Sequence, residues 1–258
     1  MRVLITNDDG IDSPGLTILA HVAADAGHEV LVAAPNKEYS GFSAGLQGEQ
    51  EESGNLRQSP GRPPGLRQGI EAIGVHGSPA LISVVAGMGG LGPRPDLVLS
   101  GINLGPNVGP AILHSGTVGA ALAAAAQGIA AVAFSITGRE IAHSETATAV
   151  VSTAFEWVTS HPQDGRVLNI NIPDVPQGDL RGLRTAQPAR FTLEDGERER
   201  QVTSMLFRPF SSDDVTFDAD SDAGLLAQGW ATATLLRSHV HDESAATMPG
   251  FNTQEVMR

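Results

Sequence analysis

Two adjacent carboxylates lie near the amino terminus, directly after a short apolar run. Residues 3–5 are Val-Leu-Ile, typical of a buried strand, and residues 7–10 are Asn-Asp-Asp-Gly. Gly10 can adopt the positive φ of a tight turn. Because neighbouring like charges repel, Asp8 and Asp9 would both stay ionised most easily with a divalent cation between them. Taken alone, the segment also fits a solvated turn or a helix cap.

Two further oxygen donors follow the ends of other predicted strands. Ser40, before Gly41, comes after the apolar run over 29–34, and Asn103 comes after the run over 96–100. With water, hydroxyl and amide oxygens can complete the oxygen shell of Mg²⁺ or Mn²⁺ around two carboxylates. Taken singly, Ser40 is typical of a turn and Asn103 of a local backbone cap. Their expected convergence with the Asp pair favours a metal site.

A glycine-rich stretch and a helix start supply groups that suit a phosphate. Residues 100–109 contain three glycines, where backbone N–H groups can approach an oxyanion closely. Residues 115–117, Ser-Gly-Thr, precede an Ala-rich helix, and Ser115 or Thr117 can cap its N-terminus. The same helix end offers free N–H groups and a positive dipole to a phosphate. Capping alone and capping with phosphate contact both stay open.

The apolar runs alternate between strand-like and helix-like segments. Strands are expected over 3–5, 29–34, 96–100, 129–134 and 167–172, and helices over 16–24, 80–87, 117–127 and 145–160. This alternation predicts an α/β chain with a doubly wound, mostly parallel sheet. Ligands of such sheets bind beyond the carboxyl ends of the strands. The loops over 7–10, 35–41 and 101–109 should therefore meet in one crevice.

One stretch interrupts the alternation. Residues 47–69 hold only Leu56 and Leu66 as large aliphatic side chains, amid Gly, Pro, Arg and Glu. This composition indicates a mobile excursion or plain linker near the crevice, with a lid as the alternative.

The C-terminal part has a different character. After Pro188 the chain becomes charged and hairpin-like, with strands expected over 190–193 and 201–207 and a polar tail from about His241. We therefore expect a catalytic core over 1–188. A small β-hairpin-rich extension over 189–258 would follow it and contact other subunits.

Composition narrows the classes of partner. The chain has 258 residues, of which 41% are hydrophobic, enough for one sizeable core. Its formal charge of −13 disfavours nucleic-acid polymers, although a bound cation can still attract a small phosphate ester. The sequence lacks a membrane-length apolar run, a signal-peptide pattern and any cysteine. These features predict a cytoplasmic protein with no membrane partner.

Four groups of residues form an ordered series of motifs over roughly residues 1–135. They are Asn7-Asp8-Asp9-Gly10 with Pro14-Gly15, Pro35 with Ser40-Gly41, Ser100-Gly101-Ile102-Asn103 with Gly105 and Asn107, and Ser115-Gly116-Thr117-Val118-Gly119-Ala120-Ala121. Together they resemble the SurE family, and weaker landmarks of that family follow at 169–173 and 220–230. The family consists of divalent-metal-dependent 5′/3′-nucleotidases, phosphatases of nucleoside monophosphates.

The resemblance implies a Rossmann-like core that holds one divalent cation, Mg²⁺ or Mn²⁺. The metal ligands that it implies are Asp8, Asp9, Ser40 and Asn103. The residues that it places beside the phosphate or the rest of the substrate are Asn7, Gly41, Asn107, Ser115, Gly116 and Thr117. It also implies a homodimer or homotetramer built through the C-terminal part.

Two chemical routes are open to such a site. A bound divalent cation would lower the pKa of a water molecule and neutralise charge that develops on the phosphate. Asp9, or Asp8, would take the proton of the attacking water, or Asp9 would attack phosphorus and form an aspartyl-phosphate. A general-acid role for His114, beside residues 115–117, is a further hypothesis.

The chain departs from the family pattern in two places. Residues 77–81 read Gly-Ser-Pro-Ala-Leu where the family usually has Gly-Thr-Pro followed by Asp-Cys, and Leu122-Ala123 replaces a common Arg-Glu pair. We expect these changes to affect substrate specificity more than metal binding. They also motivate an alternative, a non-catalytic metal- or nucleotide-binding or assembly module on the same fold. A nicotinamide dehydrogenase is disfavoured because no Gly-x-Gly-x-x-Gly follows the first strand.

Overall fold

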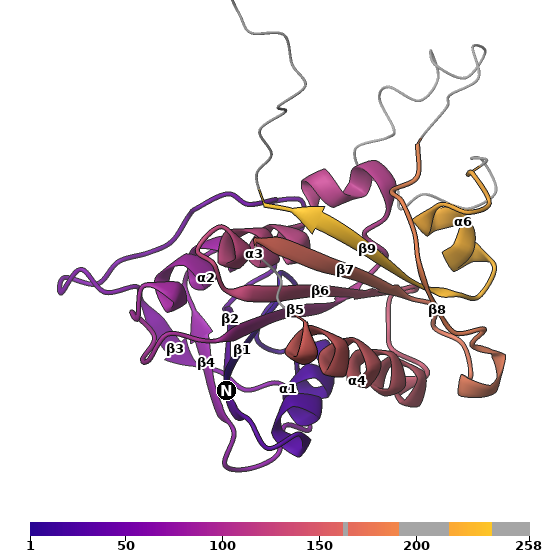
Figure 1. Cartoon of the computed structure of the whole chain (residues 1–258). Helices are drawn as coiled ribbons and strands as arrows, with labels where there is room; N and C mark the ends of the chain where they lie inside the picture. Colours follow the sequence, from indigo (N-terminus) through magenta and orange to yellow (C-terminus); the bar gives the residue numbers. More distant parts are fainter. Residues whose placement is uncertain (162–164, 191–216, 239–258) are drawn as a thin grey trace, which may run out of the picture.

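A nine-stranded sheet forms the centre of the protein. The computed structural model describes residues 1–161, 165–190 and 217–238. Within these residues the strand order is β3-β4-β2-β1-β5-β6-β7-β9-β8, and helices pack on both sides of the sheet (Figure 1).

The elements have the following bounds. The strands are β1 (Arg2–Thr6), β2 (Glu29–Pro35), β3 (Gln58–Pro60), β4 (Glu71–Val75), β5 (Leu97–Leu104), β6 (Ala130–Ile136), β7 (Arg166–Ile172), β8 (Leu183–Thr185) and β9 (Ala231–Arg237). The helices are α1 (Gly15–Asp25), α2 (Pro79–Gly87), α3 (Gly116–Ala125), α4 (Ser144–Ser160) and α6 (Asp222–Ala227). Two short 3₁₀ helices are η1 (Gly109–His114) and η2 (Gln177–Asp179).

Strand β1 lies inside the sheet and leads to the two aspartates. It pairs in parallel with β2 and β5, where Val3 lies opposite both Val30 and Leu97. Parallel pairing continues from β2 to β4 and from β5 through β6 to β7. The carboxyl ends of these strands therefore share one edge, which confirms the expected mostly parallel α/β sheet.

Side chains on the two faces of the sheet build two apolar layers. Val3 and Ile5 pack with the layer that holds α1 and α4, whereas Leu4 packs with the layer that holds α2 and α3. Such two-sided burial explains why the strands read as continuous apolar runs rather than alternating ones. It also holds the end of β1 rigidly, because both faces of the strand are covered.

Strand β5 is longer than its apolar run indicates. It continues to Leu104, so Asn103 lies within the strand rather than in the loop after it. The pairing of β5 with β6 shifts in register between Ser100 and Asn103. A Cβ at Gly101 would overlap the Phe134 carbonyl, so glycine allows the two strands to approach closely there.

The segment over 47–69 contributes an edge strand. Strand β3 pairs antiparallel with β4, and β4 pairs in parallel with β2. Both large aliphatic side chains of the segment are buried, Leu56 in the α2 and α3 layer and Leu66 in the α1 and α4 layer. This stretch is therefore attached to the core at both leucines.

The main sheet continues beyond residue 188. Strand β9 pairs antiparallel with β7 and parallel with β8, and its Ala231 and Ala233 belong to the α1 and α4 layer. The described part of the C-terminal region therefore contributes strand β9 to the main sheet. The predicted strand over 201–207, the tail from His241 and all of 190–193 except Arg190 lie outside the described residues.

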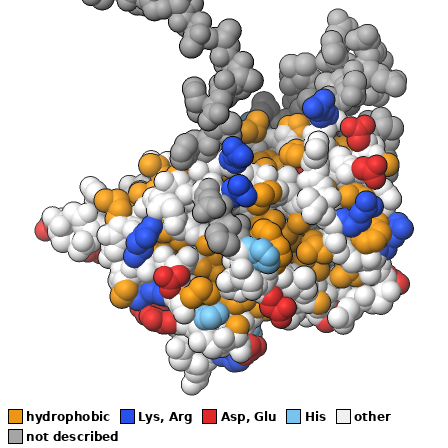
Figure 2. Space-filling model, in the orientation of Figure 1, with side chains coloured by type: hydrophobic (Ala, Val, Ile, Leu, Met, Phe, Trp, Pro, Cys, Tyr) orange, Lys and Arg blue, Asp and Glu red, His pale blue; other side chains and the backbone are white. Residues whose placement is uncertain are grey.

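Two observations concern the charges on the described surface and the lengths of the described helices. On the face drawn in Figure 2, basic and acidic side chains are interspersed among the described residues, rather than gathered in one basic field. None of the helices in the described ranges has both the length and the apolar character needed to cross a bilayer.

Candidate metal and phosphate site

A tight turn presents the two aspartates at the end of β1. Asn7 is fully buried, and its amide closes the turn by donating from Nδ2 to the Gly10 carbonyl and accepting from the Gly10 N–H, both at 3.1 Å. Gly10 has φ +103°, the conformation expected from the sequence. Asp8 is 3% exposed and Asp9 is partly exposed. Asn7 therefore shapes the turn, and Asp9 is the more accessible carboxylate.

The start of α3 packs directly against Asp8. The Thr117 hydroxyl donates to Asp8 Oδ1, and Thr117 is itself fully buried. A Cβ on Gly116 would lie 2.7 Å from Asp8 Oδ2, so only glycine leaves room for the carboxylate there. Ser115 caps the helix by accepting the Val118 N–H at 3.1 Å. The N-terminus of α3 thus faces a carboxylate, the charge that a helix dipole favours.

The loop after β2 reaches the same turn. The Tyr39 N–H donates to the Asp8 carbonyl at 2.8 Å, which joins residues 36–41 to the end of β1. The Ser40 hydroxyl donates to Glu38 Oε1 at 2.6 Å. Ser40 and Gly41 are both exposed at this loop. Glu38 is an acidic neighbour of the site that the sequence pattern gave no reason to select.

The end of β5 closes the site from the other side. The Leu104 N–H donates to Asp9 Oδ2 at 3.3 Å. The neighbouring Asn103 donates from Nδ2 to the Gly105 carbonyl at 2.6 Å. Because that bond uses the amide nitrogen, any contact of the Asn103 side chain with a cation would use its oxygen. The loops after β1 and β2, the end of β5 and the start of α3 therefore meet around Asp8 and Asp9, as the sequence predicts.

Both carboxylates titrate abnormally. Burial raises the pKa of Asp8, against the opposing effect of the Thr117 hydroxyl and nearby backbone N–H groups. Burial and the Asp8 charge raise the pKa of Asp9 to about 7, with a smaller contribution from Glu38 and an opposing one from the Leu104 N–H. A divalent cation would favour the ionised form of both groups.

The donor chemistry of the site fits a hard cation. Asp8, Asp9, Ser40 and Asn103 offer carboxylate, hydroxyl and amide oxygens, the ligand types that Mg²⁺ and Mn²⁺ prefer. Nowhere in the described part of the chain do three or more His, Cys, Asp or Glu side chains gather as a possible metal site. A cation at the Asp pair would therefore need neutral oxygens and water to complete its shell.

A buried amide network fixes the loop before η1. Asn107 donates from Nδ2 to Ser135 Oγ at 2.8 Å and from its N–H to Asn171 Oδ1 at 2.7 Å. Its carbonyl accepts from Asn169 Nδ2 at 2.9 Å and Asn171 Nδ2 at 3.1 Å. Asn107 is thus held from β6 and β7, a role that its motif position alone did not reveal. The sequence identified residues 169–173, which include Asn169 and Asn171, only as a landmark of the resembled family.

His114 directly precedes the Ser115 cap of α3. It is the last residue of η1, its side chain is exposed, and its carbonyl accepts the Ser43 N–H at 3.3 Å. Ser43 also donates from its hydroxyl to the Leu113 carbonyl at 2.7 Å. These bonds fasten the loop after β2 to the segment that leads into α3.

Comparisons with known proteins identify relatives of this chain. The family described as survival protein SurE matches residues 3–195. The chain is 36% identical to the 5′/3′-nucleotidase SurE of Cronobacter sakazakii, covering 95% of this chain and 93% of that protein. It is 33% identical to the 5′-nucleotidase SurE 1 of Burkholderia lata, covering 96% and 95%.

A solved structure shows the same architecture. The crystal structure of the SurE protein from Aquifex aeolicus superposes with a TM-score of 0.73 at 25% identity, covering 94% of this chain and 95% of that one. The motifs around Asp8 and Asp9, the family match and the shared fold lead to one conclusion. The chain belongs to the SurE family.

Proposed function

We propose that this protein is a 5′-nucleotidase, a divalent-metal-dependent phosphatase that hydrolyses nucleoside 5′-monophosphates, and also 3′-monophosphates, to nucleoside and phosphate. The observation that carries the proposal is the pair of buried Asp8 and partly exposed Asp9, with α3 starting against Asp8 and with Leu104 bonded to Asp9. The relatives named as 5′/3′-nucleotidases support the substrate class.

In this proposal, Asp8, Asp9, Ser40 and Asn103 hold one Mg²⁺ or Mn²⁺ ion. When bound, the cation supplies a water molecule of lowered pKa and positive charge near the phosphate. The pKa of about 7 at Asp9 supports this assignment, because ionising both neighbouring carboxylates at neutral pH calls for a compensating charge.

The two aspartates differ in their freedom to react. Asp8 is held by Thr117 and is almost fully buried, which suits a fixed ligand. Asp9 is partly exposed, which suits a group that takes a proton from water or attacks phosphorus directly. Trapping of a phosphorylated enzyme during rapid quench would favour attack by Asp9, and its absence would favour proton transfer.

The N-terminus of α3 supplies the groups for the phosphate. Ser115 and Gly116 lie at the positive end of the helix, beside Asp8. The Thr117 hydroxyl donates to Asp8, and the backbone N–H groups of Gly116 and Thr117 also stabilise that carboxylate, so we assign Thr117 to orienting Asp8 beside the phosphate. Asn7, Gly41 and Asn107 contribute through the turns that they shape around the substrate.

Replacing Thr117 by Val should test the orienting role. The substitution keeps a buried β-branched side chain but removes the hydrogen bond to Asp8, so we expect kcat to fall about ten-fold or more. Thr117→Ser keeps the hydroxyl and should retain most of the activity. Phosphate release at saturating metal, with the Tm of each variant recorded, measures the difference. Equal activity of the Val and Ser variants would remove the hydroxyl from the mechanism.

A non-catalytic binding or assembly module is the second candidate, motivated by the departures at 77–81 and 122–123. Those departures occupy packing positions, because Ala80 is fully buried and Leu81 and Leu122 pack into the α2 and α3 layer. Ser78 joins residues 45–47 to the start of α2 by accepting from the Gln47 N–H and donating to the Gly45 carbonyl. The side chains around Asp8 and Asp9 are intact, which favours the enzyme.

We also propose, from the family resemblance, a homodimer or homotetramer assembled through the C-terminal part and a location in the cytoplasm. Light scattering of the full chain measures the mass of the assembly directly. A monomer at micromolar concentration would contradict the proposed assembly.

A substrate panel tests the proposed activity. Phosphate release would be measured with nucleoside 5′-monophosphates, 3′-monophosphates and p-nitrophenyl phosphate at saturating Mg²⁺ or Mn²⁺. We expect the 5′-monophosphates to give the highest kcat/KM. Binding of nucleotides without phosphate release from any of them would support the non-catalytic module instead.

A further inference from the structure

A buried carboxylate joins the C-terminal part of the chain to the segment that carries the site. Asp222, the first residue of α6, is fully buried. Its Oδ2 accepts the Gly109 N–H at 2.9 Å, and its Oδ1 accepts the N–H groups of Ala189 and Ala223, each at 2.7 Å. Several charge-assisted bonds of this kind offset the cost of burying a carboxylate.

Gly109 is where this connection reaches the site. It begins η1, which ends at His114 and leads through the Ser115 cap into α3. Thr117, in the first turn of α3, donates to Asp8. Asp222 therefore anchors the beginning of a short rigid segment whose other end holds the more buried of the two aspartates.

Other contacts also hold the segment over residues 107–117 in place. Ser43 bonds to the carbonyls of Leu113 and His114, and Asn107 is held by β6 and β7. With Asp222 on Gly109, the path of residues 107–117 is fixed near its start, its middle and its end. Loss of the Asp222 contact would free the start of η1 while these other anchors remain.

We propose that Asp222 is a positioning residue for the active site, which sets η1 and the start of α3 against Asp8 from the C-terminal part of the fold. This inference rests on the proposed function, because it assigns a kinetic effect to a residue that touches neither substrate nor metal ligands. Since Asp222 belongs to α6 and contacts Ala189, it also makes the geometry of the site depend on the C-terminal residues.

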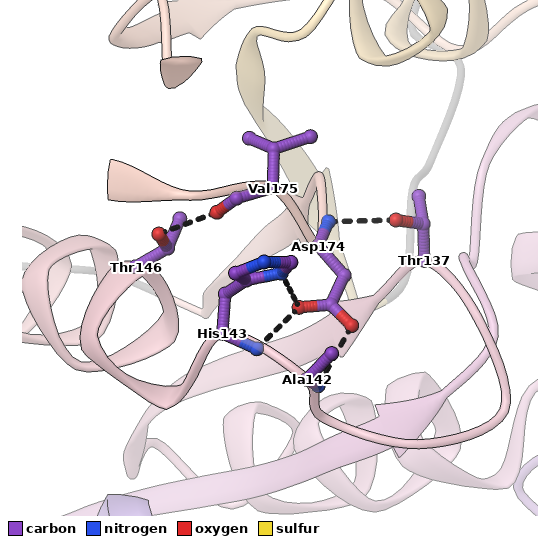
Figure 3. A network of polar contacts seen from close by, with 6 residues as sticks. All are labelled: Thr137, Ala142, His143, Thr146, Asp174 and Val175. Carbon is purple, nitrogen blue, oxygen red and sulfur yellow. Dashed lines mark hydrogen bonds and ion pairs between the residues drawn. The ribbon is translucent and has the colours of Figure 1, made fainter. Parts of the chain in front are cut away.

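Asp174 provides a matched control for this carboxylate. It follows β7, its side chain is 10% exposed, and it accepts the N–H groups of Ala142 and His143, both at 2.9 Å (Figure 3). It also contacts His143 Nδ1 at 3.1 Å, and its own N–H donates to Thr137 Oγ1 at 2.7 Å. Asp174 thus fastens the start of α4, by the same chemistry, to a segment that does not lead to Asp8.

The test compares Asp222→Asn with Asp174→Asn in the full chain. Each substitution keeps the size of the side chain and replaces one acceptor oxygen with an amide nitrogen that opposes an N–H group. We expect Asp222→Asn to increase amide hydrogen exchange over residues 105–116 and to lower kcat about ten-fold or more, with KM changed less than about three-fold. Asp174→Asn should increase exchange over 138–146 and leave kcat within about two-fold of the wild type.

Several results would overturn the inference. Unchanged exchange over 105–116 in Asp222→Asn, or equal kcat in the two variants at equal folded fraction, would each do so. If Asp222→Asn does not fold, Gly109→Ala can be used instead, because a Cβ at residue 109 would lie 2.8 Å from the Ala189 carbonyl and disturb the same junction. We expect this variant to show the same increase in local exchange and the same loss of kcat. Wild-type exchange and kcat in Gly109→Ala would overturn the inference. If the wild type releases no phosphate, the proposed function fails, and the exchange comparison alone decides whether Asp222 holds the segment.

Discussion

Asp9→Asn is expected to lower kcat for phosphate release by about 10³-fold or more, while the protein stays folded. The substitution removes a negative ligand from the proposed cation, and it removes the group that takes a proton or attacks phosphorus. An amide of the same size can still accept the Leu104 N–H, so the end of β5 should keep its place. The loss should therefore appear in catalysis rather than in folding.

The control for this variant lies in the same loop. Asp12→Asn makes the same chemical change at an exposed position three residues further along the chain, and it should leave kcat within about two-fold of the wild type. Both variants would be assayed with saturating Mn²⁺ and checked by thermal melting. Asp9→Asn that keeps a tenth or more of the wild-type kcat would rule out both proposed roles of Asp9.

The second large effect concerns stability in EDTA. The folded pKa of Asp9 is about 7, above the ordinary value of 3.8, so the folded protein binds a proton more tightly than the unfolded chain. The contribution of Asp9 to stability is therefore full at low pH and is lost as the pH rises through about 7. Since one pKa unit corresponds to about 1.4 kcal/mol, ionisation of Asp9 should lower the free energy of unfolding by about 4 kcal/mol at pH 8.

Comparing the wild type with Asp9→Asn isolates this contribution, because other carboxylates titrate in both proteins. In EDTA at pH 8 we expect the variant to be more stable than the wild type, with the difference shrinking as the pH falls toward 5. Saturating Mg²⁺ or Mn²⁺ should raise the Tm of the wild type and of Asp12→Asn, but far less that of Asp9→Asn. Urea unfolding at pH 5 and pH 8 measures the difference in the free energy of unfolding between the variant and the wild type. The same difference at both pH values would contradict the prediction.

The sequence predicted the central architecture because local pattern and tertiary burial agree there. The runs at 3–5, 29–34 and 167–172 are continuous and apolar, which matches strands covered by helices on both faces. Strand β4 was missed, since Glu71-Ala-Ile-Gly-Val75 is short and interrupted by glycine, and only its pairing with β2 defines it. Strand β9 was missed as part of the core because its partner β7 lies some 60 residues earlier in the chain.

At the site, the residue types in the sequence were enough to predict the chemistry, but not which side chains contact one another. The Asp8 and Asp9 pair could be identified from spacing and turn residues. Sequence could not decide whether Ser115 or Thr117 caps α3, because both fit an N-cap; packing against Asp8 turns the Thr117 hydroxyl inward. Glu38 was missed, and Asp222 was noted only within the family landmark at 220–230, because each acts through the folding of distant segments against one another.

Metal-dependent phosphate release from a nucleoside 5′-monophosphate tests the central proposal most directly. Wild-type protein would be treated with EDTA, freed of the chelator and titrated with Mg²⁺ or Mn²⁺ while phosphate is measured, with Asp9→Asn alongside. We predict no release before metal is added, a saturable return of activity in the wild type, and almost none in the variant. Release that persists in EDTA, or that returns equally in Asp9→Asn, would contradict a metal site built on Asp8 and Asp9.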